Sequence, residues 1–219
     1  MKFSVYEFIS NDKDLLEIYN QIDSLECSRN LWAHHGLSHI RNVVNIVENV
    51  LVQLDCDKEL MDVTMATAFL HDLGCLYGKK DHAKNGYEIV KKYFADKNIN
   101  SKYNNDILMS IKYHSNFRYL KTPIVTILRF ADKLDTTKER LAYLGYNIKG
   151  IRQYQYIEKI DVKINDKLII NFLTDSRINK QELEKFYFIK KIFRAIDEFA
   201  NYIEKPYVVL FNNKTWHLK

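Results

Sequence analysis

The stretch Ala68-Phe69-Leu70-His71-Asp72-Leu73-Gly74 decides how this sequence is interpreted. Apolar residues recur with helical spacing just before it, which predicts an amphipathic helix over residues 58–72. Gly74 is expected to end that helix, because glycine is common just beyond helix C-termini. An adjacent histidine and aspartate are therefore predicted at the end of a helix whose apolar face turns inward.

Further helices are expected on both sides of this stretch. The clearest covers residues 38–55, where apolar residues fall on one face and Ser38 is expected to be the N-cap. Pro123 suits the first turn of a helix over residues 123–135. Helices with a similar apolar period are predicted over residues 12–25, 83–96 and 104–115. Only 6 Gly and 2 Pro among 219 residues also favour a mainly α chain over a turn-rich β-sandwich.

The pattern of apolar residues changes after Gly150. Residues 160–164 and 168–172 alternate between apolar and polar, which predicts two strands joined by the three-residue loop at 165–167. A loop of that length puts the apolar side chains of both strands on one face. The unit is completed by a long helix over residues 179–204, closed by Pro206, and by a third strand over 207–211.

The expected fold is therefore a helical bundle followed by a small β-β-α-β unit of the α+β class. We place the helical domain at residues 1–147 and the C-terminal α+β subdomain at residues 148–219. No recognisable catalytic motif lies in the subdomain. It is interpreted as a lid, a dimerisation surface or a small regulatory domain, and a homodimer is one of the states it allows.

Charge and cysteine usage narrow the class of protein. The 33 Lys and Arg against 28 Asp and Glu give a net charge of +5, which can attract a phosphate-bearing substrate. No nucleic-acid recognition motif accompanies this charge, so nucleic acid is not an expected partner. Cys27, Cys56 and Cys75 form no CxxC pair and are expected to be reduced thiols of a cytoplasmic protein. Neither a secretory signal nor a membrane-spanning apolar run is expected.

Six side chains have the chemistry of metal ligands and lie on, or at the ends of, expected helices. They are His39, His71, Asp72, His82, His114 and Asp132. Four imidazoles and two carboxylates suit Fe, Mn, Ni, Co or Zn, and the set is too rich in nitrogen for a dedicated Mg or Ca site. Helices of a bundle can direct such side chains at a common centre. The alternative interpretation is that each one is a satisfied polar residue of the core.

The order and context of these residues resemble the HD superfamily of metal-dependent phosphohydrolases. In that pattern a first histidine opens a helix, a His-Asp pair ends the next helix, and an aspartate follows later. The matching positions here are His39, His71, Asp72 and Asp132, within residues 30–142. His82 and His114 match positions that supply a second metal ion in the binuclear branch of the family.

The resemblance implies a helical metallohydrolase that acts on a phosphomonoester or a phosphodiester, often of a nucleotide. It implies one or two divalent transition metals, with His39, His71 and Asp132 on the first ion and His82 and His114 on the second. Asp72 would bridge the two ions and so be the catalytic carboxylate. Two adjacent cations can activate a shared water to hydroxide and stabilise the charge of the phosphoryl oxygens.

Two departures count against the branch that cleaves cyclic di-GMP. Ser115 follows His114 where that branch has another histidine, and Cys75 stands where it has lysine. The GYP-type signature of that branch is also missing from this sequence.

Cations near the expected centre are predicted to bind substrate. They are Lys133, Lys138 and Arg140, in a segment that resembles the Asp-x-x-Lys-x-Arg stretch of one HD subgroup with a small α+β tail. Asp135 is expected either to hold one of these cations or to cap the helix end. His35 lies one turn before the first histidine, and it is assigned to the substrate site or, as in some relatives, to a further metal contact. The rim is expected to carry Lys79, Lys80 and Lys84.

Two other functions remain open on the sequence. Some HD relatives use a mixed-valence di-iron pair to activate oxygen, and the ligand set here permits that chemistry. A protein that only senses a metal or a nucleotide is the other alternative. In the main interpretation the predicted partner is a small phosphorylated substrate of nucleotide-like character. The sequence does not identify that substrate further.

Overall fold

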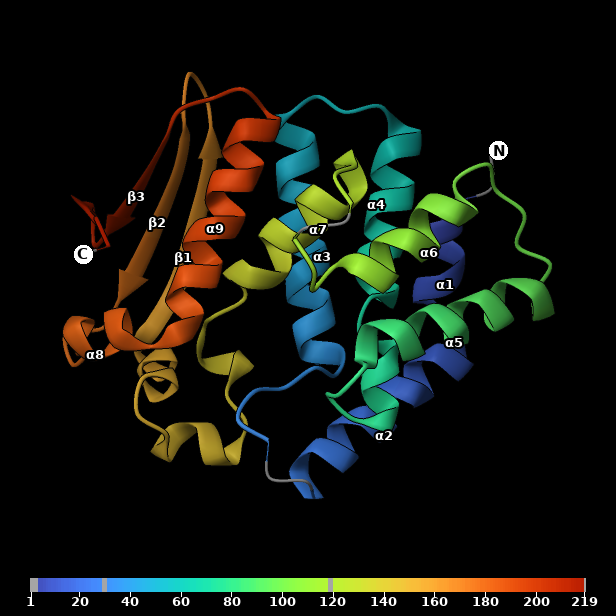
Figure 1. Cartoon of the computed structure of the whole chain (residues 1–219), viewed down its shortest axis with the longest axis horizontal. Coiled ribbons are helices and arrows are strands. Elements are labelled where there is room, and N and C mark those ends of the chain that lie inside the picture. Colours follow the sequence, from blue (N-terminus) through green and yellow to red (C-terminus); the bar gives the residue numbers. More distant parts are fainter. Residues whose placement is uncertain (1–3, 29–30, 118–119, 219) are drawn as a thin grey trace.

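The computed structural model describes residues 4–28, 31–117 and 120–218. It is mainly helical, with a small sheet at one side of the molecule, and this confirms the predicted fold class (Figure 1). The helices of the bundle are α1 (Val5–Ser10), α2 (Lys13–Ser28), α3 (Leu37–Gln53), α4 (Lys58–Leu70), α5 (His82–Asp96), α6 (Asn104–Tyr113) and α7 (Pro123–Leu134). Short 3-10 turns follow α4 and α7, namely η1 (Leu73–Tyr77), η2 (Lys138–Arg140), η3 (Tyr143–Asn147) and η4 (Ile151–Tyr156).

Two predicted helix ends are wrong. The helix α3 begins at Leu37 with Gly36 as its N-cap, so Ser38 lies inside the first turn and is not the cap. The helix α4 ends at Leu70, and Gly74 lies within η1 and does not stop the helix. A Cβ atom on Gly74 would stand 1.9 Å from the backbone oxygen of His82. This glycine is needed because the backbones of η1 and α5 touch there.

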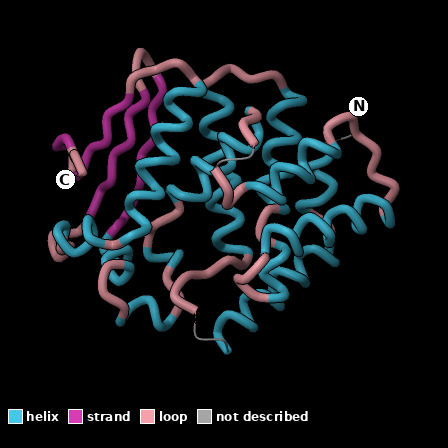
Figure 2. The backbone as a smooth tube through the Cα atoms, in the orientation of Figure 1, coloured by secondary structure: helices cyan, strands magenta, loops and turns pink. Residues whose placement is uncertain are grey.

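The sheet contains β1 (Ile157–Ile164), β2 (Leu168–Thr174), β3 (Tyr207–Phe211) and the short β4 (Lys214–Thr215), in that order (Figure 2). The predicted hairpin register is confirmed, because Ile164 pairs with Leu168 and Ile160 pairs with Phe172. The strand β3 runs parallel to β2. The sequence did not predict β4.

The long C-terminal helix is interrupted. It consists of α8 (Lys180–Lys185) and α9 (Tyr187–Tyr202), separated by Phe186 in an extended conformation. The Phe186 side chain is buried against Tyr154, with the ring centroids 6.1 Å apart. Tertiary packing of this ring therefore outweighs the helical pattern that runs through residue 186.

The helix α9 joins the sheet to the bundle. It lies between the sheet and the helices of the bundle (Figure 1), and it contacts β3 and α7. Phe199 of α9 stacks on Phe130 of α7 with 4.2 Å between the ring centroids. Gln53 at the end of α3 binds the backbone of β1 at Val162 and Ile164. The buried apolar side chains of the bundle and the sheet consequently form one continuous core.

Two further expectations bear on the environment of the protein. Within the described residues, no helix combines the length and the apolar character that crossing a bilayer requires. Cys56 and Cys75 are free thiols. The side chain of Cys27 lies outside the described part of the chain, so the expectation for it is not addressed.

Candidate metal centre

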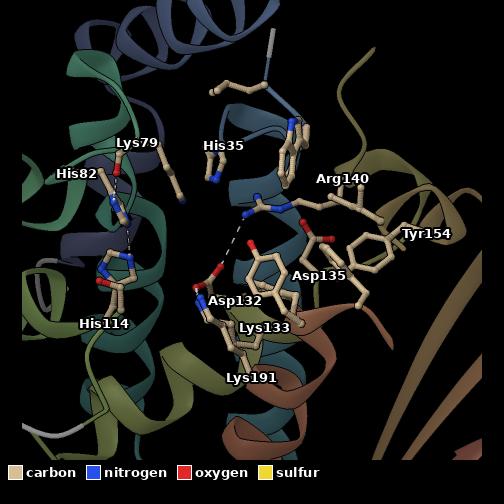
Figure 3. A pocket seen from close by; sticks show the side chains of 18 of the residues that line it. His35, Lys79, His82, His114, Asp132, Lys133, Asp135, Arg140, Tyr154 and Lys191 are labelled. Atoms are coloured by element: carbon tan, nitrogen blue, oxygen red, sulfur yellow. Dashed lines mark hydrogen bonds and ion pairs between the residues drawn. The ribbon is translucent and has the colours of Figure 1, made fainter. Parts of the chain in front are cut away.

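The six predicted ligands come from separate elements and meet at one place. His39 lies in the first turn of α3, His71 and Asp72 follow α4, and the remaining three belong to later helices. Those three are His82 at the start of α5, His114 just after α6, and Asp132 in α7. Figure 3 shows His82 and His114 on one side of the cavity and Asp132 facing them. All but His82 are buried.

Asp72 lies between two pairs of imidazoles. Its Oδ2 atom is 3.5 Å from Nε2 of His39 and 3.4 Å from Nε2 of His71. Its Oδ1 atom is 3.6 Å from Nε2 of His82 and 3.7 Å from Nε2 of His114. Each carboxylate oxygen therefore faces a different pair of ring nitrogens.

Asp132 belongs to the first of these pairs. Its Oδ1 atom is 3.5 Å from Nε2 of His39 and 4.0 Å from Nε2 of His71. The ligand atoms fall into overlapping groups of three, each spanning no more than 4.8 Å. These groups are His39, His71 and Asp72; His71, His114 and Asp132; and Asp72, His82 and His114.

Backbone carbonyls orient three of the imidazoles in the same way. Nδ1 of His71 donates to the carbonyl of Ala68 at 2.8 Å, and Nδ1 of His114 donates to that of Ile111 at 2.7 Å. Nδ1 of His82 donates to the carbonyl of Lys79 at 2.9 Å. In each case the acceptor lies three residues earlier, and the Nε2 lone pair is left for a ligand.

A carboxylate orients the fourth imidazole. Nδ1 of His39 donates to Oδ2 of Asp135 at 2.6 Å, and Asn42 donates to the other oxygen of Asp135 at 3.2 Å. Asp135 is the C-cap residue of α7, which agrees with one of the two expectations from the sequence, and its side chain accepts from His39 and Asn42. A carboxylate behind a ligating histidine fixes the ring and raises its basicity.

The cluster has the unpaired atoms that a metal ion would satisfy. Nε2 of His39, Nε2 of His71 and Oδ1 of Asp72 are buried without a hydrogen-bond partner among the described residues. Such atoms are rare in proteins because each one costs free energy. Nε2 of His82 and Nε2 of His114 lie 3.1 Å apart although both Nδ1 atoms already carry the proton. Two facing lone pairs repel each other, so a cation between them would stabilise the arrangement.

The charges around the cluster favour metal binding. Burial by itself would raise the pKa of Asp72, but the nearby His71, Lys79 and His39 hold it well below its usual value. Asp72 is therefore a carboxylate. Burial lowers the pKa of His82 and, more strongly, that of His114. Both rings are consequently neutral, which is the form of histidine that binds a metal.

A cavity of about 640 Å³ opens onto the cluster. Of the predicted substrate contacts, Lys133, Arg140 and His35 line it. Lys133 donates to Asp132, and a nitrogen of Arg140 lies 4.0 Å from the same carboxylate. Lys138 does not line the cavity, since its side chain is 66% exposed and lies 3.8 Å from Glu139. The structure places Lys138 on the surface, and its contact with substrate stays a prediction.

The other residues predicted at the rim divide in the same way. Lys79 lines the cavity, whereas Lys80 and Lys84 are exposed and are not among its lining residues. The backbone carbonyl of Lys79 also accepts the hydrogen bond from Nδ1 of His82, so Lys79 contributes to the centre through its backbone.

His35 is held by a second carboxylate. Its Nδ1 donates to Glu26 at 2.5 Å, and its backbone N–H donates to the other oxygen of Glu26 at 2.8 Å. Burial lowers the pKa of His35 to about 3, so the ring is neutral and its Nε2 carries a lone pair. In Figure 3 the ring of His35 points into the cavity. Glu26 was not singled out in the sequence.

Sequence reasoning also missed one wall of the cavity. It is formed by aromatic and basic residues of the C-terminal unit, namely Tyr154, Phe186, Tyr187, Phe188, Lys191 and Arg194. The signal that was available is the spacing of Tyr187, Lys191 and Arg194, which puts them on one face of a helix. Nothing in the sequence indicated that this face meets the metal ligands.

Comparisons with known proteins agree with this geometry. The HD domain matches residues 36–137, a range that contains all six ligand candidates. Residues 36–137 of the chain are an HD domain. The resemblance seen in the sequence is confirmed, and an HD domain with this His and Asp cluster indicates a metal-dependent hydrolase. The HD domain here contains α3 to α7, while α9 and the sheet lie outside it.

One solved structure is similar to part of this chain. It is a predicted HD superfamily hydrolase from an uncultured Thermotogales bacterium, 20% identical, with a TM-score of 0.45. The match covers 57% of this chain and 68% of that one. A comparison with curated proteins finds no match.

Proposed function

We propose that this HD protein hydrolyses a phosphomonoester or a phosphodiester of nucleotide-like character with a pair of divalent transition metals. The observation that carries the proposal is the position of Asp72, whose two oxygens face different pairs of imidazoles. A carboxylate between two such pairs suits the ligand that bridges two ions. The first ion would be held by His39, His71 and Asp132 with Asp72, and the second by His82 and His114 with Asp72.

The donor set fits Fe, Mn, Co, Ni or Zn, because imidazole nitrogen outnumbers carboxylate oxygen. A bound pair of such ions would activate a water and neutralise charge on the phosphoryl oxygens. The remaining steps depend on the residues of the cavity.

Two cations would bind the phosphoryl group. Lys133 and Arg140 both contact Asp132 and both face the cavity, so they place positive charge next to the ligand cluster. Nη1 of Arg140 is buried without a hydrogen-bond partner in the described part of the chain, which leaves it available for a phosphoryl oxygen. A guanidinium is well suited to this contact because its donors match the geometry of phosphate.

His35 would accept a proton from a water or a substrate hydroxyl. Glu26 holds its Nδ1–H, so its Nε2 can accept a hydrogen bond from a water or a substrate hydroxyl in the cavity. Glu26 stabilises the charge that forms on the ring when it accepts the proton. His35 would therefore act on the substrate side of the cluster, as the sequence predicted, and not as a metal ligand.

The test begins with elemental analysis of the purified protein. Phosphate or alcohol release is then followed with p-nitrophenyl phosphate, bis-p-nitrophenyl phosphate and nucleotide monophosphates, using the metal found. We expect the variant Asp72→Ala to lose both metal and turnover, while Asp166→Ala, in the exposed hairpin loop, keeps both. Melting curves of the two variants show whether each one folds.

Three results would contradict the proposal. The first is turnover by metal-free Asp72→Ala protein. The second is a pair of observations that would favour the oxygenase. The two-iron protein consumes oxygen with a substrate, and the Mn²⁺ or Co²⁺ protein hydrolyses none of the esters under anaerobic conditions. The third is nucleotide binding without any turnover, which would favour the sensor.

A further inference from the structure

Residues of α9 form part of one wall of the cavity. Tyr187, Lys191 and Arg194 follow one another at intervals of four and three residues, so they share a face of this helix. The face of α9 that carries Ile192, Ile196 and Phe199 is buried in the core. The helix thus has one face fixed by packing and another that borders the same space as the metal ligands.

Lys191 stands beside Lys133 in this wall. The ammonium groups of Lys191 and Lys133 lie 5.6 Å and 5.8 Å from the centre of one ring, that of Phe188. Lys191 also lies 5.3 Å from the ring of Tyr187. The two lysines come from α9 and α7, so the charge of the substrate site continues onto the C-terminal unit. Figure 3 shows Lys191 below Lys133, on the side of the cavity away from Lys79.

These cations of α9 are not neutralised by the protein. Among the residues that the structure describes, no carboxylate oxygen lies within 4.0 Å of Lys191 or Arg194. Lys133, by contrast, is bound to Asp132. Burial and the charges of Lys133 and Lys79 lower the pKa of Lys191, which shows how closely the positive groups are gathered. Like charges gathered in one cavity favour a bound anion.

Arg194 is held in place at the edge of this group. Its guanidinium carbon lies 4.6 Å from the centre of the Phe117 ring, and both residues line the cavity. A guanidinium stacked on a ring keeps its donors free in the plane of the group. Arg194 can therefore donate to an anion while its guanidinium stays stacked on the Phe117 ring.

The cavity also offers surfaces for a ring. Trp32 is 44% exposed and Tyr187 is 57% exposed, and both line the cavity. Large aromatic side chains that are uncovered inside a cavity favour a flat, apolar ligand group. The hydroxyl of Tyr154 in the same wall is buried and has no partner among the described residues, so it remains available to a polar atom of that ligand.

We propose that Lys191 and Arg194 form a second phosphate subsite beside the metal centre, and that the substrate is an aromatic compound with at least two phosphate groups. This inference rests on the proposed hydrolytic function. One phosphate would lie at the ligand cluster with Lys133 and Arg140, and the other would lie on α9. A nucleoside diphosphate and a nucleoside 3′,5′-bisphosphate are the simplest compounds of this class.

The experiment compares the number of phosphates on one nucleoside. AMP, ADP and adenosine 3′,5′-bisphosphate are offered to the metal-loaded wild type, to Lys191→Ala/Arg194→Ala, and to Lys190→Ala. Lys190 is the matched control because it is exposed on the same helix and does not line the cavity. Initial rates give KM and kcat for each nucleotide that is turned over, and calorimetry gives Kd for each one that is not.

We expect the double variant to weaken binding of ADP or of the bisphosphate by about tenfold or more, with AMP and the Lys190→Ala control changed by less than about threefold. Equal losses for AMP and both doubly phosphorylated nucleotides would overturn the subsite, and so would no loss at all. A protein that binds the doubly phosphorylated nucleotides through α9 without hydrolysing any ester would refute the proposed function and keep the subsite. If the double variant hydrolyses the nucleotides with the same preference among them as the wild type, the subsite is refuted and the proposed function is kept.

A ring-free probe tests the aromatic part of the proposal. Trp32→Ala and Tyr187→Ala are expected to weaken ADP by about fivefold or more and to leave pyrophosphate unchanged, because only ADP carries a base. Both side chains are partly exposed, so their removal leaves the core intact. Equal effects on the two ligands would overturn the assignment of these rings.

Discussion

His39 and Asp135 are 96 positions apart in the sequence, and their side chains meet at 2.6 Å behind the ligand cluster. The carboxylate accepts the Nδ1 proton of His39 and so directs Nε2 toward Asp72 and Asp132. It stands in the place that carboxylates take behind zinc-bound histidines. The last turn of α7 therefore supplies both a ligand and, three residues later, the group that orients another ligand.

We expect Asp135→Asn to lower metal affinity by about 10- to 100-fold without removing any ligand. The amide cannot stabilise the Nδ1 proton as a carboxylate does, so His39 becomes a weaker and less well-oriented donor. Competition against a chelator of known affinity measures the effect, with Asp166→Asn as the control for a lost surface charge. An affinity equal to that of the wild type would show that Asp135 has no part in binding.

Metal uptake is expected to depend on pH through His39. Burial and Arg140 lower the pKa of His39, but Asp132, Asp135 and Asp72 together outweigh them and raise it to about 9 in the metal-free protein. A raised pKa stabilises the metal-free fold below about pH 6.5, and this contribution is lost as the pH rises through 9. A metal ion needs the neutral ring, so its affinity increases with pH up to about 9.

Calorimetry in buffers of different ionisation enthalpy measures this proton. At pH 7 we expect about one proton to leave the protein for each ion bound at the His39 side. No proton release at that pH would contradict the assignment. The stability of the metal-free protein, measured by denaturant unfolding from pH 6 to 9, should fall over the same range.

Gly74→Ala is expected to disturb the position of His82. A Cβ atom there would lie 1.9 Å from the backbone oxygen of His82 and 2.4 Å from the backbone nitrogen of Gly86, so α5 must move. If two ions bind, the ion at the His82 side should be lost first, and metal analysis should fall from about two ions per chain toward one. Gly86→Ala on the same helix is the comparison, because its nearest contact would be a side-chain atom at 3.3 Å. Equal metal content in both variants would count against this role.

Arg129 connects the C-terminal unit to the end of α6. Its side chain is fully buried and donates to the carbonyls of His114 at 3.2 Å and Tyr113 at 2.8 Å, and to Glu198 of α9 at 3.2 Å. Arg129→Met would leave these acceptors unpaired, so we expect a loss of about 3–5 kcal/mol in the free energy of unfolding. Urea unfolding measures it, and Arg177→Ala provides the control. Arg177 is 72% exposed, and its ion pair should contribute less than about 1 kcal/mol.

The sequence predicted the parts of the fold that depend on local patterns. Periodic apolar residues predicted α2 to α7 of the bundle but not the short α1, and the alternation on either side of residues 165–167 predicted the hairpin register. The errors have tertiary causes. Gly74 ends no helix because it serves a contact with α5, and the break at Phe186 follows from packing against Tyr154. Neither contact can be predicted from the sequence pattern around Gly74 or Phe186.

In the candidate site, too, the sequence predicted what depends on residue type and missed what depends on tertiary contacts. Ligand-type side chains could be recognised by their chemistry, and the structure brings all six predicted ligands together, although their roles remain predictions. Glu26 and Arg129 act through partners distant in sequence and were not singled out, and Asp135 was singled out without its role as the partner of His39. Lys138 shows that a cation close to the ligands in sequence can lie on the surface in space.

The two faces of α9 have different freedom to vary. Phe199 and its neighbours are constrained by the core, whereas Tyr187, Lys191 and Arg194 line the cavity and lie outside that core. A small library at these three positions, with residues 36–137 left untouched, is consequently a direct route to altered ligand preference. Such a library would keep the candidate metal ligands and change only the residues that select the substrate.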